Sequence, residues 1–177
     1  MTEESTLEAA WQQAPVSGKT RHVILVRHGQ CNETSKDDLL RKLTPSGRLQ
    51  AERTGTRLAR MAQGASSFDD FECNGLCVIQ ALGSSSMTRA RETAKIISKH
   101  LKMQLEAPNP LLNEALPSPM ILIRTDVKGA AEEVDANHDR IKEGFQKYIY
   151  REEPSKEEAD EFEIVVCHGN VIRHAFC

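Results

Sequence analysis

Two segments of this sequence share one design, in which a short apolar run ends in a His-Gly pair. One run covers residues 22–27 and leads into His28, and the other covers residues 162–167 and leads into His168. Both runs are short and rich in β-branched residues, which is typical of fully buried strands in a parallel sheet. Because ligands of such sheets bind at the carboxyl ends of the strands, we expect the two histidines to face the same crevice.

The rest of the chain alternates between helical and strand patterns. Thr44-Pro45 predicts a helix start, with threonine as the N-cap and proline at the first helical position, and this helix should reach about Ala62. The other predicted elements are a strand over 75–82, a helix that follows the serines at 84–86 and reaches about Leu101, a short strand over 103–106, a helix over 129–150 and a helix that begins near Val171. This alternation predicts an α/β fold, a three-layer α/β/α sandwich with a mostly parallel sheet.

Length and composition limit the classes of protein that fit. A chain of 177 residues suits one domain, which we expect over 21–177 after a loose N-terminal arm over 1–20. The net charge of −3 argues against a nucleic-acid-binding protein. The N-terminus has no apolar stretch typical of a secretory signal, and no apolar run is long enough for a membrane span. We therefore expect a cytoplasmic chain from these patterns alone.

The five cysteines predict reduced thiols rather than a disulfide framework or a metal site. Their number is odd, and their spacings do not form close pairs throughout the chain. Cys73 and Cys77 are four residues apart, but no further His or Cys pair follows at zinc-finger spacing. No metal or other cofactor is expected from the sequence.

Arginines near the predicted strand ends suit the binding of an anion. The strand over 75–82 leads through three serines into a helix that carries Arg89, and Arg27 precedes the first histidine. Backbone N–H groups at a helix start and the planar donors of arginine both match phosphate oxygens. Arg27, Arg89 and the two histidines are therefore predicted to converge on one phosphate.

The same residues suit phosphoryl transfer, which needs a positioned nucleophile and positive charge around the equatorial oxygens. A histidine is nucleophilic when it is neutral and has one ring nitrogen free. The leaving oxygen needs an acid, and a carboxyl group in a crowded site can have its pKa raised enough to supply one. Glu114, which follows two leucines in a proline-rich loop, is the candidate.

Five motifs, taken in order, resemble the histidine phosphatase (phosphoglycerate mutase) superfamily. They are VRHGQ at 26–30, LTPSGRLQA at 43–51, SSSMTRARETA at 84–94, LLNEA at 111–115 and VVCHGNVIRH at 165–174. The segments TRHVILVRHGQ, SSMTRARETAKIISKHL and CHGNVIRHAFC are most similar to a mitochondrial branch of serine/threonine protein phosphatases. The resemblance covers about Thr20 to Cys177.

The resemblance implies a role for each matching position. His28 would be the nucleophile that is transiently phosphorylated, and Glu114 would be the proton donor and later the base that activates water. Arg27 and Arg89 would hold the phosphate together with Asn170, and His168 would hydrogen-bond it and stabilise the transition state. The implied activity is that of a metal-independent phosphomonoesterase acting on a phosphoprotein. The resemblance also implies a mitochondrial location and pairing into a homodimer.

The sequence departs from the family pattern at several places. Mutases of the superfamily carry an asparagine six residues after the nucleophile, where Thr34 stands here, and Asn32 is out of register. The similar branch has an N-terminal membrane anchor and a tryptophan-rich assembly motif, whereas Trp11 is the single tryptophan here. The family also continues beyond the last histidine, so we expect the domain over 21–177 to lack its usual C-terminal portion.

Three other functions stay open from the sequence. A phosphatase or mutase of the same fold that acts on a small phosphomonoester would use charged residues of the two loops, namely Lys36, Arg41, Lys42, Arg124 and Lys128. A catalytically impaired protein would bind phosphorylated partners without hydrolysing them. Cys167 to Arg173 also has the C-x5-R spacing of cysteine-dependent phosphatases. That loop has Asn170 where such enzymes have glycine, so a buried structural Cys167 and a structural Arg173 are the preferred interpretations.

Overall fold

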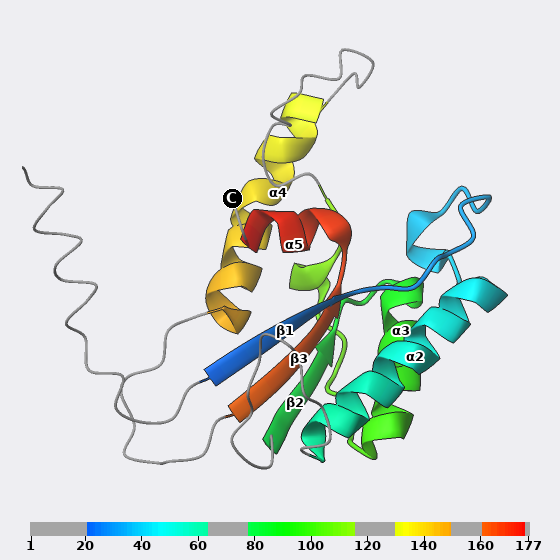
Figure 1. Cartoon of the computed structure of the whole chain (residues 1–177). Helices are drawn as coiled ribbons and strands as arrows, with labels where there is room; N and C mark the ends of the chain where they lie inside the picture. Colours follow the sequence, from blue (N-terminus) through cyan, green and yellow to red (C-terminus); the bar gives the residue numbers. More distant parts are fainter. Residues whose placement is uncertain (1–20, 64–77, 116–129, 150–160, 176–177) are drawn as a thin grey trace, which may run out of the picture.

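The computed structural model describes residues 21–63, 78–115, 130–149 and 161–175. Its centre is a parallel sheet in the order β1-β3-β2 (Figure 1). These strands span Arg21–Arg27 (β1), Val78–Ser84 (β2) and Glu161–Cys167 (β3). The parallel sheet predicted from the sequence is confirmed.

Helices cover both faces of the sheet, as Figure 1 shows. One face carries α2 and α3, which span Pro45–Ala62 and Thr88–Leu101. The other face carries α4 and α5, which span Ala130–Tyr148 and Gly169–Ala175, and two 3-10 turns lie at Asp38–Leu40 (η1) and Pro110–Leu112 (η2). The predicted three-layer α/β/α sandwich is confirmed.

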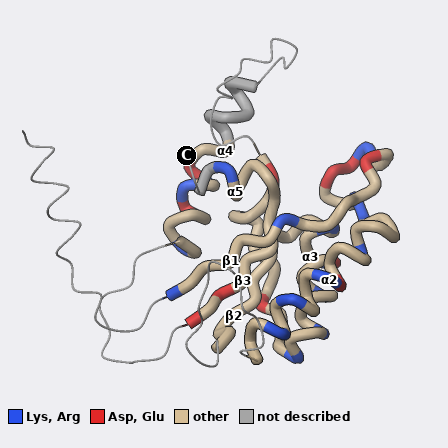
Figure 2. The backbone as a smooth tube through the Cα atoms, viewed as in Figure 1, with Lys and Arg blue, Asp and Glu red and all other residues tan. Residues whose placement is uncertain are grey.

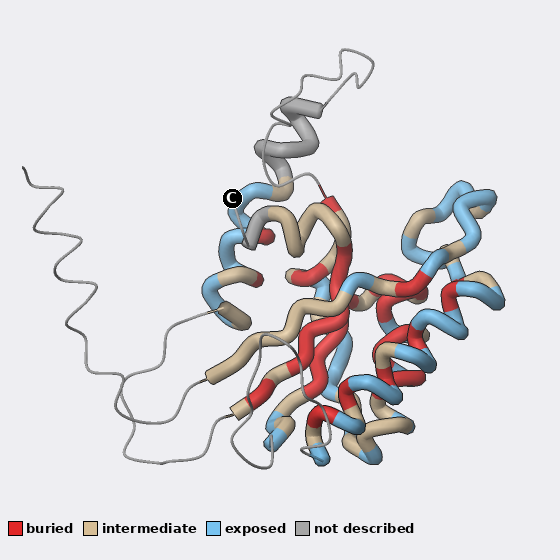
Figure 3. The backbone as a smooth tube through the Cα atoms, viewed as in Figure 1, coloured by how far each residue is buried: buried red, intermediate tan, exposed pale blue. Residues whose placement is uncertain are grey.

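The core consists of two apolar layers that follow the alternation of side chains along the strands. Phe162, Ile164 and Val166 of β3 pack in one cluster with leucine, methionine, alanine and isoleucine side chains of α2 and α3. The intervening Val165 and Cys167 pack on the opposite face with residues that include Leu112, Tyr148 and Val171. β3 is therefore buried on both faces, which Figure 3 shows for the centre of the molecule.

The prediction of a fully buried strand over 22–27 is wrong for β1. Its residues are half-buried, and Arg27 is exposed. The reason is its place in the sheet, because among the described strands β1 pairs with β3 alone. An open groove of about 670 Å³ borders β1, with Ile24, Val26 and Leu58 among its lining residues.

Three further boundaries differ from the predictions. Lys102 adopts a left-handed conformation that ends α3, and the segment 103–106 then forms no strand. That segment reaches β2 only at its end, where the Glu106 N–H donates to the Leu82 carbonyl over 3.0 Å. β2 continues to Ser84, two residues beyond the predicted end, and α5 begins at Gly169 instead of near Val171.

The start of α2 holds the loop that follows β1. Thr44 caps the helix as predicted, and its hydroxyl accepts a hydrogen bond from the Gly47 N–H over 3.0 Å. The two backbones approach so closely that a Cβ atom at Gly29 would lie 2.3 Å from the Gly47 carbonyl oxygen, and one at Gly47 would lie 2.0 Å from the Gln30 carbonyl oxygen. Only glycine fits at these two positions, and this contact fixes the backbone next to His28.

Candidate active site

The two histidines come together at the carboxyl edge of the sheet. The His28 N–H donates to the Cys167 carbonyl over 3.1 Å, and the Ser85 N–H donates to the Val166 carbonyl over 3.0 Å. These bonds extend the ladder by one residue beyond the ends of β1 and β2. The ring centroids of His28 and His168 consequently lie 5.0 Å apart, with the rings tilted by 59°. The structure thus brings both sequence-predicted histidines into one site.

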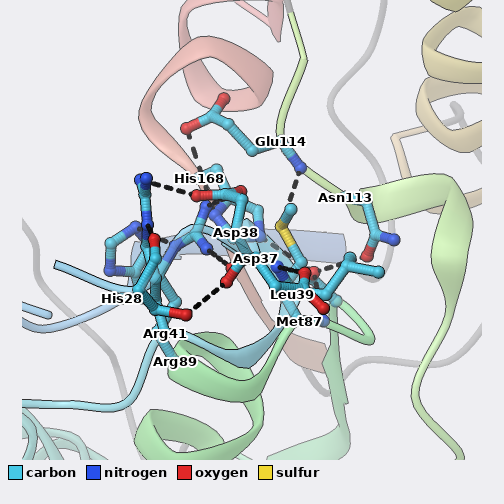
Figure 4. A network of polar contacts seen from close by, with 12 residues as sticks. His28, Asp37, Asp38, Leu39, Arg41, Met87, Arg89, Asn113, Glu114 and His168 are labelled. Atoms are coloured by element: carbon cyan, nitrogen blue, oxygen red, sulfur yellow. Dashed lines mark hydrogen bonds and ion pairs between the residues drawn. The ribbon is translucent and has the colours of Figure 1, made fainter. Parts of the chain in front are cut away.

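The His28 ring is held with Nε2 as its free nitrogen. Its Nδ1 lies 2.7 Å from the Gly29 carbonyl oxygen, which can only accept, so Nδ1 carries the proton. The Nε–H of Arg89 points at Nε2 over 3.1 Å (Figure 4). Burial lowers the pKa of His28 below its ordinary 6.5, and the positive charges of Arg89 and Arg27 lower it further. The ring is therefore neutral at pH 7, with its Nε2 lone pair beside a guanidinium group.

Arg89 is almost fully buried, with 4% of its surface exposed, and its other donors are bound by the loop that contains η1. Its Nη1 donates to the Asp38 carbonyl oxygen over 2.8 Å, and its Nη2 binds the Asp38 carboxylate over 3.0 Å. Arg41 binds the same carboxylate over 2.7 Å. The loop therefore carries acidic and basic residues side by side at the edge of the site (Figures 2 and 4).

Glu114 lies above His168, on the loop that follows η2 (Figure 4). Its Oε1 accepts a hydrogen bond from the Asn170 N–H over 3.3 Å, and its Oε2 lies 4.0 Å from His168 Nδ1. Burial raises the pKa of the Glu114 carboxyl above its ordinary 4.5, against the opposing effect of the Asn170 N–H. A carboxyl group in this setting is suited to gain and lose a proton during a reaction.

His168 is fully buried and neutral. Its Nε2 lies 2.8 Å from the Ser85 hydroxyl oxygen. Burial lowers its pKa to about 3, and nearby positive charge, from Arg89 first, adds to this shift. At pH 7 the ring therefore adds no charge of its own to the site.

Arg27 and Asn170 take positions less central than those of Arg89 and His168. Arg27 is exposed at the end of β1 and runs alongside α5, since a Cβ atom added at Gly169 would lie 3.5 Å from its Nε. Asn170 lies in the first turn of α5, where its backbone N–H and its side chain both contact the Glu114 carboxylate. In this structure Asn170 therefore contacts Glu114, the candidate proton donor.

The geometry does not favour the cysteine alternative. Cys167 is fully buried in β3, in a cluster with Leu112 and Val165. Burial raises the pKa of its thiol to about 12, so almost no thiolate exists at neutral pH. The preferred interpretation of Cys167 as a structural residue agrees with this placement.

Sequence reasoning missed three residues that shape the site. Asp38 binds Arg89, Asn113 binds the serines that precede α3, and Arg140 of α4 donates to the carbonyl groups of Pro110, Leu111 and Asn113. Asn113 stands next to Glu114 in the LLNEA motif, in which the glutamate alone is a predicted site residue. Asp38 and Arg140 lie in charged segments that carry no local signal of these contacts.

Two further properties concern only the described part of the chain. Its histidine, cysteine, aspartate and glutamate side chains form no group of three or more arranged to hold a metal ion. None of its helices combines the length and the apolar character that crossing a membrane requires. Cys73, Cys77, Arg124 and Lys128 lie outside the described residues.

Comparison with known proteins places this arrangement in a family. The crystal structure of phosphoglycerate mutase from Plasmodium falciparum superposes with a TM-score of 0.52, at 31% identity over 90% of this chain and 69% of that chain. The chain belongs to the histidine phosphatase (phosphoglycerate mutase) superfamily. The family predicted from the five motifs is thereby confirmed. No protein-family model matches the chain.

Within the histidine phosphatases, the chain is similar to mitochondrial protein phosphatases. It is 38% identical over 162 residues to the serine/threonine-protein phosphatase PGAM5 of Xenopus tropicalis, and 38% identical over 158 residues to that of Homo sapiens. Each match covers 89% of this chain. The chain spans about half the length of these relatives, 51% and 50% respectively.

Proposed function

We propose that the chain is a phosphomonoesterase that acts on phosphoserine or phosphothreonine in proteins, through a phosphohistidine formed on His28. The observation that carries this proposal is the state of His28. It is a neutral ring with Nδ1–H bound to the Gly29 carbonyl, and its Nε2 lone pair points toward the Arg89 donor. The names of the PGAM5 relatives, all serine/threonine-protein phosphatases, support the choice of substrate.

In the first half of the proposed reaction, His28 Nε2 attacks phosphorus. A P–N bond forms while the P–O bond to the serine or threonine oxygen breaks, and the leaving oxygen takes a proton from Glu114. The raised pKa of Glu114 supports this role, because it increases the fraction of protonated carboxyl near neutral pH. The Arg89 Nε–H, which donates to Nε2 in the free protein, then binds a phosphate oxygen instead.

In the second half, water attacks the phosphohistidine. Glu114, now a carboxylate, takes a proton from the water, the P–N bond breaks and inorganic phosphate leaves. Neutral His28 returns with its Nδ1–H still donating to the Gly29 carbonyl oxygen. No other nucleophile is needed in this scheme, and Cys167 takes no part in it.

Positive charge around the phosphate supplies the rest of the proposed catalysis. Arg89 and Arg27 would bind the equatorial oxygens, and both already act on His28 as positive charges. His168 would stabilise the transition state from the opposite side of the site. Asn170, which contacts Glu114, would assist by orienting that carboxyl group next to the phosphate.

The test is hydrolysis of para-nitrophenyl phosphate in EDTA by wild type, His28→Ala and Cys167→Ser. We expect activity in wild type and in Cys167→Ser, loss in His28→Ala, inhibition by vanadate and an acid-labile phosphoenzyme. Phosphopeptides that contain serine or threonine would then be compared with small phosphomonoesters. Full activity in a folded His28→Ala protein would contradict the proposal.

The relatives also support a mitochondrial location, since both are named as mitochondrial proteins. We propose that this chain acts on phosphoproteins of that organelle. Cell fractionation with the native protein detected by antibody is the direct measurement. Recovery in the cytosolic fraction alone would contradict the location and leave the proposed chemistry intact.

A further inference from the structure

A cluster of polar side chains lies behind His168. The Ser85 hydroxyl lies 2.8 Å from Asn113 Oδ1, and the same Oδ1 lies 3.0 Å from the Ser86 backbone nitrogen and 2.9 Å from the Ser86 hydroxyl. Ser85 is fully buried and also touches His168 Nε2 over 2.8 Å. Asn113 therefore connects to the His168 ring through one hydroxyl group.

The direction of each hydrogen bond follows from what each atom can do. The Ser86 backbone N–H can only donate, so the Asn113 atom that it meets is the amide oxygen. An amide oxygen has no proton, so the Ser85 hydroxyl must donate to it. The single proton of Ser85 is thus committed to Asn113.

The remaining bonds of Ser85 fix the proton on His168. The Ser85 oxygen accepts from the Met87 N–H over 3.1 Å and also contacts His168 Nε2. Since Ser85 has no second proton to donate, Nε2 must carry a proton and donate it. One donated and two accepted bonds use the full hydrogen-bonding capacity of a hydroxyl group.

The other ring nitrogen of His168 is left with a bare lone pair. His168 Nδ1 is buried and makes no hydrogen bond with any of the described residues, and it faces Glu114 Oε2 at 4.0 Å. A buried nitrogen without a partner is costly in a folded protein and calls for an explanation, of which a catalytic role is one. The bare nitrogen lies on the side of the ring that faces the candidate acid.

We propose that Ser85 and Asn113 are positioning residues that hold His168 as the Nε2–H tautomer, so that Nδ1 is the nitrogen presented to the phosphate. This inference rests on the proposed role of His168 at a phosphate site. It adds that Nδ1 donates a hydrogen bond to a phosphate oxygen only after it gains a proton. The free protein opposes that protonation, because positive charge on Arg89, Arg27 and Arg140 adds to the effect of burial. A bound phosphate, which brings negative charge among these arginines, would favour it.

The tautomer is measurable without any activity. Long-range proton–nitrogen NMR of the ring nitrogens, recorded on the wild-type chain at pH 7, should give a protonated Nε2 and an unprotonated Nδ1 for His168. The ring is assigned by its loss in His168→Asn. A protonated Nδ1 with an unprotonated Nε2 in wild type would overturn the inference, whether or not the protein hydrolyses phosphate.

Two variants with opposite expectations test the role of Asn113. Asn113→Ala frees the Ser85 proton to point at His168 Nε2, so a second population with the proton on Nδ1 should form. Ser86→Ala removes a hydroxyl from the same amide oxygen without touching His168, so the ring spectrum should match wild type. Asn113 is only half-buried, so its replacement should leave the fold intact. An unchanged tautomer in Asn113→Ala, or the same change in both variants, would overturn the proposed role.

Kinetics and the NMR spectrum together separate positioning from a general loss of structure. Asn113→Ala should lower kcat for para-nitrophenyl phosphate by roughly 10- to 100-fold, the range seen for partners that orient metal-bound histidines, with little change in KM. A loss of fold would also lower the apparent kcat, but it would collapse the chemical-shift dispersion of the whole NMR spectrum, which a loss of positioning leaves as in wild type. If His28→Ala keeps full activity, the proposed function fails. The tautomer of His168 is still tested, because the NMR measurement does not depend on activity.

Discussion

Arg89 donates to His28 Nε2 and, at the same time, binds the Asp38 carboxylate over 3.0 Å. Asp38 thus occupies Arg89 donors that a phosphate would use in the proposed reaction. The Asp38 side chain is 41% exposed, whereas that of Arg89 is 5% exposed, so the carboxylate can leave more easily than the guanidinium can move. In the proposed reaction, an incoming phosphate would therefore have to displace Asp38 from Arg89.

Asp38→Asn should therefore strengthen the binding of inorganic phosphate. The change removes a charge that competes for Arg89, and half-exposed ion pairs contribute up to about 1 kcal/mol, so the inhibition constant should fall by about two- to fivefold. Competitive inhibition by phosphate is the measurement, with Asp37→Asn as the neighbouring control. Weaker phosphate binding in Asp38→Asn would show instead that Asp38 orients Arg89 for the ligand.

Arg89→Lys should lower kcat/KM by roughly 100-fold, in the range seen when one donor to a developing charge is lost. Lysine keeps the positive charge but not the planar fork that reaches His28 and Asp38 together. Steady-state kinetics measures the effect, and thermal unfolding checks that the buried site still folds. A loss in kcat/KM of less than about threefold would mean that a positive charge at this position is sufficient for activity, without the planar guanidinium group.

The pH dependence of kcat/KM should be bell-shaped. Activity rises as His28 loses its proton, at a pH below the ordinary histidine pKa of 6.5, because burial and two arginines lower its pKa. Activity falls as Glu114 loses its proton, at a pH above the ordinary 4.5. In Glu114→Gln the falling limb should vanish, and alkyl phosphates should slow by about 100-fold more than para-nitrophenyl phosphate, whose leaving group needs no acid. A falling limb that survives in Glu114→Gln would assign it to another group.

The folded chain should lose stability in acid, in part through His168. Its pKa is about 3 in the folded protein and near 6.5 when unfolded, so between these values the unfolded chain binds the extra proton. The contribution of neutral His168 to the free energy of unfolding is complete above pH 6.5 and is lost as the pH falls toward 3. Urea unfolding at several pH values should give a flatter acid limb for His168→Asn than for wild type. Equal slopes would show that folding does not shift the pKa of His168.

Gly47→Ala should destabilise the fold by about 1–3 kcal/mol, the usual cost of overpacking. The new methyl group would meet the Gln30 backbone at 2.0 Å, and the loop next to His28 would have to move. Gly83→Ala is the control, because its new methyl group meets the flexible end of Glu106 at 3.1 Å. Denaturant unfolding of both variants gives the difference, and similar free energies for the two would contradict the backbone contact.

The sequence predicts the α/β class and the meeting of the two histidines because both depend on local patterns. A β-branched run followed by His-Gly indicates a strand end, and parallel strands bring their carboxyl ends to one edge. The helix start at Thr44-Pro45 is equally local. Glu114 is predicted as the acid from its place in a proline-rich loop, and the resemblance implies the same role.

The contacts that tune the site depend on tertiary structure. Asp38 and Arg89 are 51 residues apart in the chain, and Ser85 and Asn113 are 28 apart, so no window of sequence contains either pair. The half-burial of β1 has the same origin, because an apolar run looks alike in a central and an edge strand. Hydrogen-bond directions such as that of Ser85 emerge only when every partner is known.

The order β1-β3-β2 has a consequence for how the chain folds. Among the described strands, β1 and β2 have no common hydrogen bonds, and each pairs with β3, which is the last of the three to be synthesised. The apolar faces of α2, α3 and the first two strands are buried fully only after β3 has been synthesised and completes the sheet. Such long-range pairing slows folding and leaves apolar surface open to aggregation in the meantime. A nascent chain that stops before residue 161 is thus expected to need a chaperone.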